Sequence, residues 1–174
     1  MRKGFFASLL LLISVIFSSC ANSNLLVSDS QIIDARFNKI LTALEKRDRE
    51  ALTMLFSPKA IREAQNFTDS MELLFEYYSG GNALYEDDSP LVAEKSQDYG
   101  VERKVIEKSY DVTTDAETYR FAVSFVVADD ADADSVGIWA LYVIKLSDDT
   151  TPGMTYWGDG KNTPGINIGI PSPK

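Results

Sequence analysis

Apolar residues return every three or four positions in the first part of the chain's body. The segment Ser28-Asp29-Ser30-Gln31 has the spacing of a capping box, in which the first serine accepts a hydrogen bond from the backbone three residues on. The apolar positions that follow are Ile33, Phe37, Ile40, Leu41 and Leu44. This periodicity predicts an amphipathic helix of about four turns that begins at Ser28.

Three shorter helices are predicted next. Asp48 is placed to cap the second helix and Ser57-Pro58 to begin the third, because serine caps well and proline suits the first helical position. Thr68 or Asp69 is expected to cap the fourth helix, and Gly80-Gly81 to end it. The apolar stripe of this fourth helix comprises Met71, Leu74, Phe75 and Tyr78.

From Leu84 onward the apolar period becomes alternating, which is typical of strands. Tyr119–Val127 alternates apolar with mostly polar or small residues and predicts the clearest strand. Ile138–Leu146 is apolar at both parities, so we expect a central strand covered on both faces, one of which is available to a dimer. Val101–Val112 is expected to be a strand with one side in water. Shorter strands are expected at Leu84-Tyr85, Leu91–Glu94 and Ile166–Ile170.

Helices first and strands afterwards predict an α+β fold, in which N-terminal helices pack on one face of a curved antiparallel sheet. The chain contains no internal repeat and no linker long enough to divide its body. One domain is therefore expected over residues 28–171, followed by a short tail at 172–174.

The N-terminal stretch is a separate unit. Arg2 and Lys3 precede the apolar run Phe5–Phe17, which would span about 20 Å as a helix, well short of a bilayer core of about 30 Å. The run is therefore interpreted as part of an export signal over residues 1–19, and not as a membrane span.

Phe17-Ser18-Ser19-Cys20 looks like a bacterial lipobox, in which the thiol is diacylated and cleavage leaves the cysteine as the new N-terminus. Cys20 is the only cysteine, and residues 20–27 would follow it as a polar tether. This interpretation predicts a lipoprotein held in the bacterial cell membrane and facing the extracytoplasmic side. The alternative is an ordinary signal peptide, with Cys20 incidental.

Charge and composition narrow the chemistry. The formal charge is −9, and loss of the two cations Arg2 and Lys3 with the signal makes it −11, which opposes binding to nucleic acid. The chain has no histidine, so Ser-His-Asp and Cys-His arrangements and histidine metal ligands are excluded. We therefore favour a protein that is not an enzyme, and we expect no cofactor.

Two acidic segments are candidates for a metal-binding or catalytic site. Asp130, Asp132 and Asp134 have the spacing of a calcium loop, but Ser135 and Leu141 stand where that loop needs glycine and glutamate. A solvated hairpin turn without metal is expected there.

The second segment, Asp87-Asp88 with Glu94 and Asp98, offers paired carboxylates for acid–base chemistry. Its loop-like composition favours exposure to solvent. No nucleotide-binding or zinc-binding motif accompanies either segment.

Aromatic residues are the remaining candidates for a ligand site. Tyrosine and tryptophan combine an apolar body with a polar tip, which suits a pocket between helices and sheet. The candidate pocket residues are Tyr85, Tyr110, Tyr119, Trp139, Tyr142 and Trp157. Their alternative role is packing in the core or in a dimer.

Four segments carry a family resemblance: ARFNKILTALEKRDREALTMLFSPKA, SYDVTTDAETYRF, DSVGIWALYVIK and PGINIGIP. From about Ser30 to Pro171 the chain resembles an uncharacterised family of bacterial lipoproteins, domain of unknown function 5104. That family resembles the nuclear-transport-factor-2-like, or cystatin-like, superfamily. The resemblance implies helices around a strongly bent antiparallel sheet that encloses a cone-shaped cavity. Enzymes of the superfamily often use an Asp–His pair, which this chain lacks.

Three functions are compatible with these features. The first is a membrane-anchored accessory domain that binds a small apolar or aromatic ligand without catalysis. The second is a histidine-free enzyme that uses Asp, Glu or Tyr within the cone. The third is a homodimeric interaction module in which the cone is filled.

Overall fold

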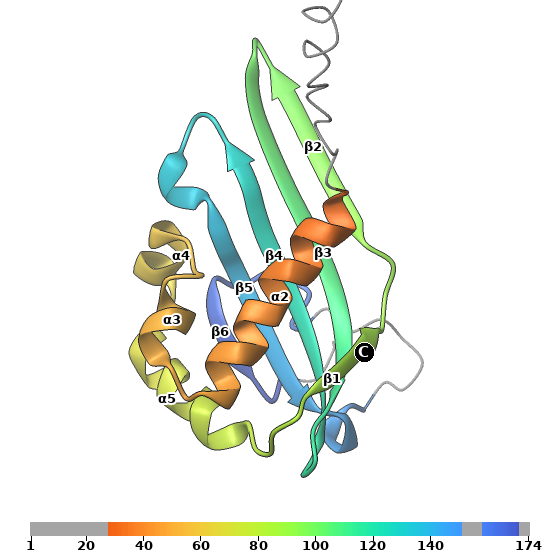
Figure 1. Ribbon diagram of the computed structural model, residues 1–174. Helices are drawn as coiled ribbons and strands as arrows, with labels where there is room; N and C mark the ends of the chain where they lie inside the picture. The colour runs from red at the N-terminus through yellow and green to blue at the C-terminus, as the bar shows by residue number, and fades with distance from the viewer. Residues whose placement is uncertain (1–27, 151–157, 171–174) are drawn as a thin grey trace, which may run out of the picture.

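The computed structural model describes residues 28–150 and 158–170. Within them four α-helices precede six strands, which confirms the predicted α+β fold (Figure 1). The helices are α2 (Asp29–Glu45), α3 (Arg49–Thr53), α4 (Pro58–Glu63) and α5 (Phe67–Tyr77). The strands are β1 (Leu84–Asp87), β2 (Val92–Asp98), β3 (Val101–Thr113), β4 (Thr118–Asp129), β5 (Gly137–Lys145) and β6 (Gly165–Ile168). The predicted leader, Cys20, the tether, Trp157 and the tail lie outside the described residues.

The first three helices begin where the sequence predicts. Ser28 and Gln31 form both halves of a capping box at the start of α2, which satisfies backbone N–H groups that have no partner inside the helix. Asp48 accepts from the Ala51 N–H to cap α3. Ser57 caps α4, with proline in its first turn.

The predicted ends of α5 were both wrong. The helix starts at Phe67 after Asn66, whose backbone is left-handed with φ 55° and whose side chain makes no cap bond. Asparagine tolerates this conformation, so the chain turns before Thr68. At the other end Tyr78 is extended. Gly80 does not end the helix. It permits the backbone to approach Thr114 closely, because a Cβ at Gly80 would lie 2.5 Å from Thr114 Oγ1.

The sheet has the order β1-β3-β4-β5-β6, and β2 pairs with the remaining length of β3. All pairings are antiparallel except β5 with β6, which is parallel. The expectation of a wholly antiparallel sheet was therefore wrong. A parallel neighbour requires the chain to return across the sheet before pairing, and a tight turn cannot supply that return.

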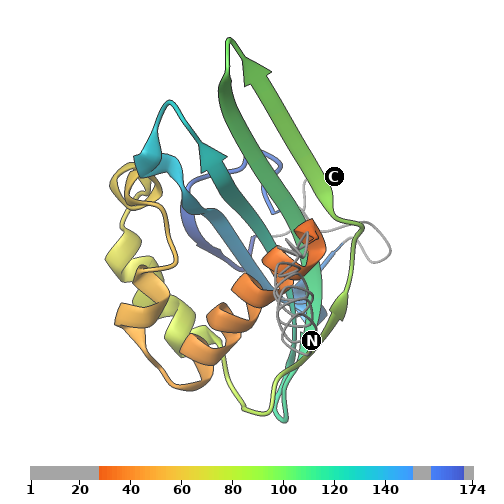
Figure 2. The same ribbon diagram turned by 45° about the horizontal axis from the view of Figure 1, so that its top comes forward.

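Two register shifts interrupt the ladders, at Lys104/Val105 on β3 and at Ser124/Phe125 on β4. Bulges of this kind bend a strand and increase its twist. The sheet is open, and the two views show α2 lying across one face (Figures 1 and 2). This arrangement is consistent with the predicted curved sheet.

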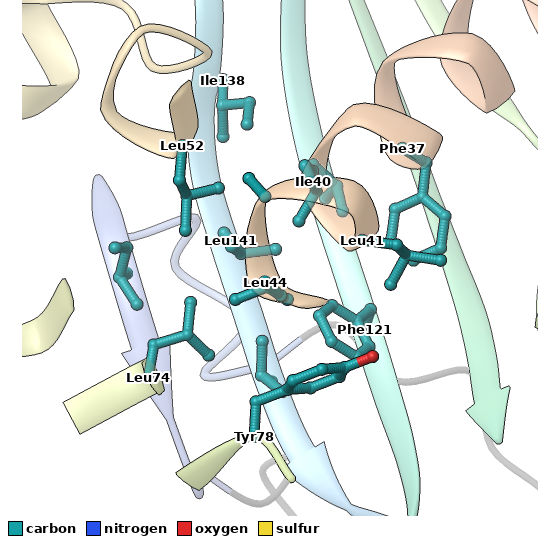
Figure 3. Close-up of a cluster of buried hydrophobic side chains, with 14 of the residues drawn as sticks. Phe37, Ile40, Leu41, Leu44, Leu52, Leu74, Tyr78, Phe121, Ile138 and Leu141 are labelled. Atoms are coloured by element: carbon teal, nitrogen blue, oxygen red, sulfur yellow. The ribbon is translucent and has the colours of Figure 1, made fainter. Parts of the chain in front are cut away.

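The main core lies between the helices and the inner face of the sheet, which is the face that α2 crosses. Phe37, Ile40 and Leu44 of α2 are fully or almost fully buried, together with Phe121 of β4 and Leu141 of β5 (Figure 3). These are the apolar positions that the helical and alternating periods predict. The prediction that Phe121 faces the core is confirmed.

A second, smaller cluster lies on the outer face, which points away from α2. Its buried members are Ala122, Ala140, Tyr142 and Ile144, and Trp139 packs against them. The prediction that β5 is covered on both faces is therefore confirmed. The described chain itself contributes to the outer cover, since Gly158 lies directly against the Tyr142 ring.

The prediction that one side of β3 faces water holds only for the first part of that strand. From Val105 onward both faces are largely covered, and even Lys108 is only 2 % exposed. The cover comes from α2 on the inner face and from ion-paired side chains on the outer face. The charged residues of β3 suggested that this strand is exposed. Their ion pairs with oppositely charged side chains allow them to be buried.

Candidate functional site

The predicted aromatic residues do not form one pocket. Tyr85, Tyr110 and Tyr119 contact other rings of the inner-face core, whereas Trp139 and Tyr142 belong to the outer-face cluster. The sheet separates the two groups. Because a strand alternates its side chains between faces, residues that share an aromatic character need not share a site.

The interior of the predicted cone is packed with aromatic side chains. Phe37 stacks on Tyr110 with ring centroids 3.8 Å apart, and Tyr85 contacts both rings edge-on. The Tyr85 hydroxyl accepts a hydrogen bond from Asn38 on α2. Tyr85 and Tyr110 therefore hold α2 against the sheet and act as packing residues.

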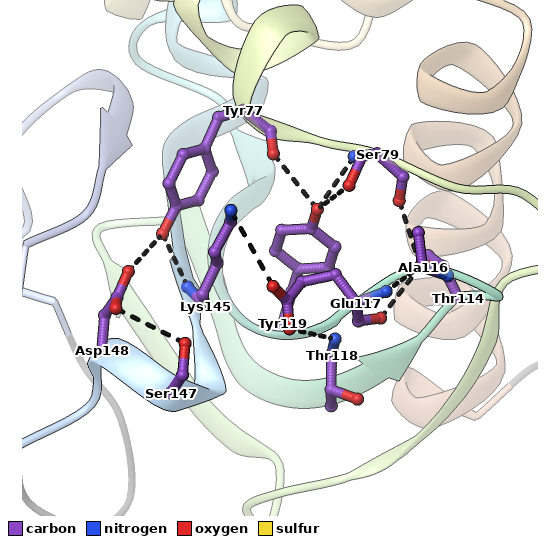
Figure 4. A network of polar contacts seen from close by, with 10 residues as sticks. All are labelled: Tyr77, Ser79, Thr114, Ala116, Glu117, Thr118, Tyr119, Lys145, Ser147 and Asp148. Carbon is purple, nitrogen blue, oxygen red and sulfur yellow. Dashed lines mark hydrogen bonds and ion pairs between the residues drawn. The ribbon is translucent and has the colours of Figure 1, made fainter.

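Tyr119 also has a structural role. Its hydroxyl accepts from the Ser79 N–H at 2.8 Å and donates to the Tyr77 carbonyl at 3.1 Å (Figure 4). The Tyr77 hydroxyl in turn accepts from the Lys145 N–H at 2.8 Å. These contacts fasten the end of α5 to β4 and β5.

Lys108 is a buried cation that the sequence analysis did not single out. Its ammonium lies 2.9 Å from Asp34 on α2 and 2.9 Å from Asp87 on β1. Burial lowers the pKa of Lys108, but hydrogen bonds to Asp87 and Asp34 outweigh burial and raise it above its ordinary value. Tyr110 also donates to Asp34, at 2.9 Å. This polar cluster links three elements and is saturated by its own members.

Asp87 and Asp88 do not act as a pair. Asp87 binds Lys108 on the inner face, whereas Asp88 lies 3.3 Å from Arg120 and accepts from Ser109 on the outer face. The Asp88 side chain is only 10 % exposed, so the expectation of a solvated segment was wrong for this residue. Arg120, with Asp88 and two further carboxylates beside it, supplies the compensating charge.

The outer face carries a pocket of about 330 Å³, which is at the lower end of the usual range for small-ligand sites. Strands β2 to β5 supply its floor, and the loop 158–163 supplies one wall. The lining residues are Val92, Glu107, Ala122, Val123, Ser124, Tyr142, Gly160 and Asn162. Among the predicted candidates that the structure describes, Tyr142 alone lines this pocket.

The loop 158–163 is fixed over the outer face by Tyr142. The tyrosine hydroxyl donates to Asp159 Oδ1 at 2.7 Å and accepts from the Thr163 N–H at 2.6 Å. The Thr163 hydroxyl donates to the other Asp159 oxygen at 2.6 Å. Burial raises the pKa of Tyr142, and the bond to Asp159 raises it further, so the phenol stays protonated as the donor.

Two further contacts set how close the loop lies. A Cβ at Gly158, where φ is +58°, would lie 2.1 Å from the Tyr142 ring, so glycine permits the loop to rest on that ring. Trp139 donates from Nε1 to the Asn162 carbonyl at 2.9 Å. Trp139 therefore positions the wall of the pocket, and its ring packs on the outer cluster.

Glu107 is the charged group of the pocket. Its Oε1 accepts from Asn162 Nδ2 at 3.0 Å and from the Ser124 hydroxyl at 3.2 Å. Among residues 28–150 and 158–170, no lysine or arginine forms an ion pair with Glu107. The pocket therefore combines apolar and aromatic surface with a carboxylate that has only neutral donors. Such a lining suits a small ligand that brings a cationic or hydrogen-bond-donating group.

Glu107, Ser124, Asp159 and Asn162 were not predicted as site residues. Gly158-Asp159-Gly160 is a turn signal in the sequence, and a turn signal does not reveal which strand face the loop covers. The acidic hairpin is exposed to solvent at Asp130 and Asp134, as expected, and its carboxylates also have partners within the chain.

Each carboxylate of that hairpin has a different partner. Asp132 pairs with Lys59 and Asp134 with Arg62, both on α4. Asp130 accepts from the Glu102 N–H on β3. The three groups thus diverge, and within the described ranges no cluster of three potential ligands has metal-site geometry.

Comparison with known proteins confirms one part of the resemblance in the sequence, the match to domain of unknown function 5104. None of the helices in the described residues has the length and apolar character needed to cross a membrane. No curated protein matches the chain. Residues 39–146 match the family described as Domain of unknown function (DUF5104); the match covers the last part of α2, the other three helices and all strands except β6. Since this match spans more than half of the sequence, the chain belongs to the DUF5104 family.

Proposed function

We propose that this protein is a lipid-anchored, extracytoplasmic binding domain that holds a small ligand in the outer-face pocket and does not transform it. In this proposal Cys20 carries the lipid and residues 20–27 form the tether. We also propose that the domain is a member of the nuclear-transport-factor-2-like superfamily, in line with helices packed on one face of a curved sheet.

The observation that carries the binding function is the position of Glu107. Its carboxylate lies in the floor of the pocket beside Tyr142 and Ala122, and its bonds come from the neutral groups of Ser124 and Asn162. A ligand ammonium would pair with this carboxylate, and an apolar or aromatic body would contact the rest of the lining. The proposed ligand is therefore a small amine with an apolar body.

The packed inner face argues against the enzyme alternative. Chemistry in the cone needs open space beside Tyr110 or Asp34, and the Phe37 ring occupies the position 3.8 Å from the Tyr110 ring. Asp34 is also already bound to Lys108 and Tyr110. These groups would need to separate before they could reach a substrate.

Benzylamine is a suitable probe of the pocket, and benzoate is its anionic match. Isothermal titration of the full chain in detergent should show binding of benzylamine and not of benzoate. Glu107→Gln should weaken benzylamine binding about tenfold, as expected for loss of a charged hydrogen bond. Glu86→Gln, an equal change at an exposed residue of β1, should leave binding unchanged. Equal affinity of the wild type and Glu107→Gln would refute the assignment.

The anchor is tested separately. Metabolic labelling with a fatty-acid probe should mark the wild-type protein and not Cys20→Ser, and the variant should leave the membrane fraction. Equal labelling of the two would exclude lipidation at this residue. Native mass spectrometry of the detergent-extracted wild type would also report a co-purified ligand and any homodimer.

A further inference from the structure

A second hollow lies on the opposite side of the molecule from the outer-face pocket, along α2 and α3. It consists of two adjoining parts of about 480 and 240 Å³, and both parts are lined by Lys39, Met54 and Leu55. One part extends towards Lys46 at the end of α2, and the other extends to Phe125 on β4. We call the continuous hollow the α2–α3 groove.

The floor of the α2–α3 groove is apolar. Met54 closes α3 and is 75 % exposed, although it is a large hydrophobic residue. Ala43, Ala51 and Leu55 continue the apolar surface beside it. Methionine is unbranched and polarisable, and it is common on surfaces that adapt to flexible apolar ligands. An exposed methionine at the centre of a groove therefore marks a place for an apolar chain.

The rim of the groove is positively charged. Arg36, Lys39 and Lys46 lie along one side of α2 at intervals of three and seven residues, which places them on one helical stripe. Within the part of the chain that the structure describes, no carboxylate forms an ion pair with any of them. Asp48 also lines the groove, but its side chain caps α3 through the Ala51 N–H.

Most lysines and arginines of residues 28–150 and 158–170 do form ion pairs. Lysines and arginines of neighbouring elements are paired, for example Arg49 with Glu72 and Lys59 with Asp132. Arg36 is half-buried and its guanidinium stands 5.7 Å from the Phe125 ring centroid. Burial lowers the pKa of Arg36, and no anion opposes that effect. Three cations that have no ion-pair partner among the described residues thus surround one apolar groove.

We infer that the α2–α3 groove binds a single-chain amphiphilic anion, namely a free long-chain fatty carboxylate. The carboxylate would lie at Lys39, between Arg36 and Lys46, and the alkyl chain would follow Met54 and Leu55. Charge complementarity selects the head group, since the net charge of −9 repels anions elsewhere. The recessed apolar floor suits one alkyl chain, which loses contact with water along its length.

Photo-crosslinking tests this inference on the full chain in phosphatidylcholine nanodiscs. The probe is a diazirine-bearing palmitate, and its matched controls are the corresponding alcohol and a diazirine-bearing phosphatidylglycerol. The acid is expected to label the peptides that contain Lys39 to Leu55 far more than the alcohol does. Equal labelling by the alcohol, or labelling of these peptides by phosphatidylglycerol alone, would overturn the inference. The latter result would identify a membrane contact.

Two variants test separately the charged rim and the apolar floor of the α2–α3 groove. Lys39→Gln removes the central charge, and Met54→Ser removes the apolar floor; both side chains are exposed, so the fold should persist. Each should reduce labelling by palmitate about tenfold, the effect of losing one charged hydrogen bond or its apolar equivalent. Lys95→Gln alters net charge equally on the distant β2–β3 hairpin and should leave labelling intact. Unchanged labelling of Lys39→Gln and Met54→Ser would refute the site.

Discussion

The Phe37 ring on α2 lies parallel to the Tyr110 ring on β3, with centroids 3.8 Å apart and planes inclined by 8°. Both side chains are fully buried. The pair fills the space between α2 and the sheet in which a cone-shaped cavity was expected. The inner face of the sheet therefore serves for packing, and the hollows available to ligands lie on the outer face and along the outside of the helices.

Phe37→Ala should be strongly destabilising. It removes a fully buried ring and its contacts with Tyr110, Tyr85 and Phe121, so the free energy of unfolding should fall by about 3–5 kcal/mol. Leu73→Ala on α5, where the side chain is 56 % exposed, should cost less than about 0.5 kcal/mol. Denaturant melts of the two variants give the comparison, and similar losses would mean that the inner face is not tightly packed.

Asp34→Asn should weaken the fold at neutral pH by about 1–3 kcal/mol, because it removes the charge that balances buried Lys108 and leaves a weaker, neutral acceptor for Tyr110. Asp98→Asn on the exposed hairpin is the matched control and should be close to neutral. Unfolding free energies at pH 7 measure both effects.

The same residue gives a dependence on pH. Burial raises the pKa of the Asp34 carboxyl, but hydrogen bonds from Lys108 and Tyr110 outweigh burial and hold it below its ordinary value of 3.8. A carboxyl whose pKa is lower in the folded than in the unfolded protein stabilises the fold at any pH above its unfolded pKa. This stabilisation is lost as the pH falls through its folded pKa. The difference between wild type and Asp34→Asn should therefore shrink when melts are repeated at pH 3 and below. A constant difference would contradict the assignment.

Gly158→Ala should displace the loop 158–163. The added Cβ would lie 2.1 Å from the Tyr142 ring, in addition to the strain of a positive φ. Gly169→Ala separates the two effects, because Gly169 also has a positive φ but no atom within 4 Å of the added Cβ. Gly169→Ala should lower the free energy of unfolding by about 1–2 kcal/mol, and Gly158→Ala should lower it by about 1–3 kcal/mol more.

Proteolysis provides a local readout of that loop. Trypsin should cut after Lys161 faster in Gly158→Ala than in Gly169→Ala, and binding of benzylamine should weaken only in the former. Equal cleavage in the two variants would show that contact with Tyr142 does not hold the loop.

The acidic hairpin should stabilise the fold slightly. Asp132 and Asp134 pair with Lys59 and Arg62 on α4, so changing both to asparagine should lower the melting temperature slightly, as expected for exposed ion pairs. The loss should largely disappear in 1 M NaCl, where such pairs are screened. Calcium should raise the melting temperature no more than sodium at equal ionic strength; a calcium-specific rise would show that these carboxylates converge on a metal.

Short-range features of the fold were predictable from sequence. The caps at Ser28, Asp48 and Ser57 depend on contacts three residues apart, and the face of Phe121 depends on strand parity. Local spacing encodes both kinds of feature. The α+β order also followed from the change of apolar period at Leu84.

Features that depend on distant partners were not predictable. Ser124 was correctly placed on the outward parity, yet it is only 5 % exposed because the wall residue Asn162 and Glu107 bind it. Lys108 lies in the core because Asp34 and Asp87 approach from 74 and 21 positions earlier in the chain. Local spacing in a single sequence does not indicate which distant residues will be in contact.

The parallel pairing of β6 has a consequence for how ligand preference can change during evolution. The floor of the outer-face pocket belongs to the paired strands, which fall within the family match at residues 39–146, whereas the wall at 158–163 follows that match. Substitutions in the wall can alter the pocket without disturbing a strand register. Relatives are therefore expected to retain the floor while diverging in the wall, which would change the proposed ligand preference while the sheet is kept.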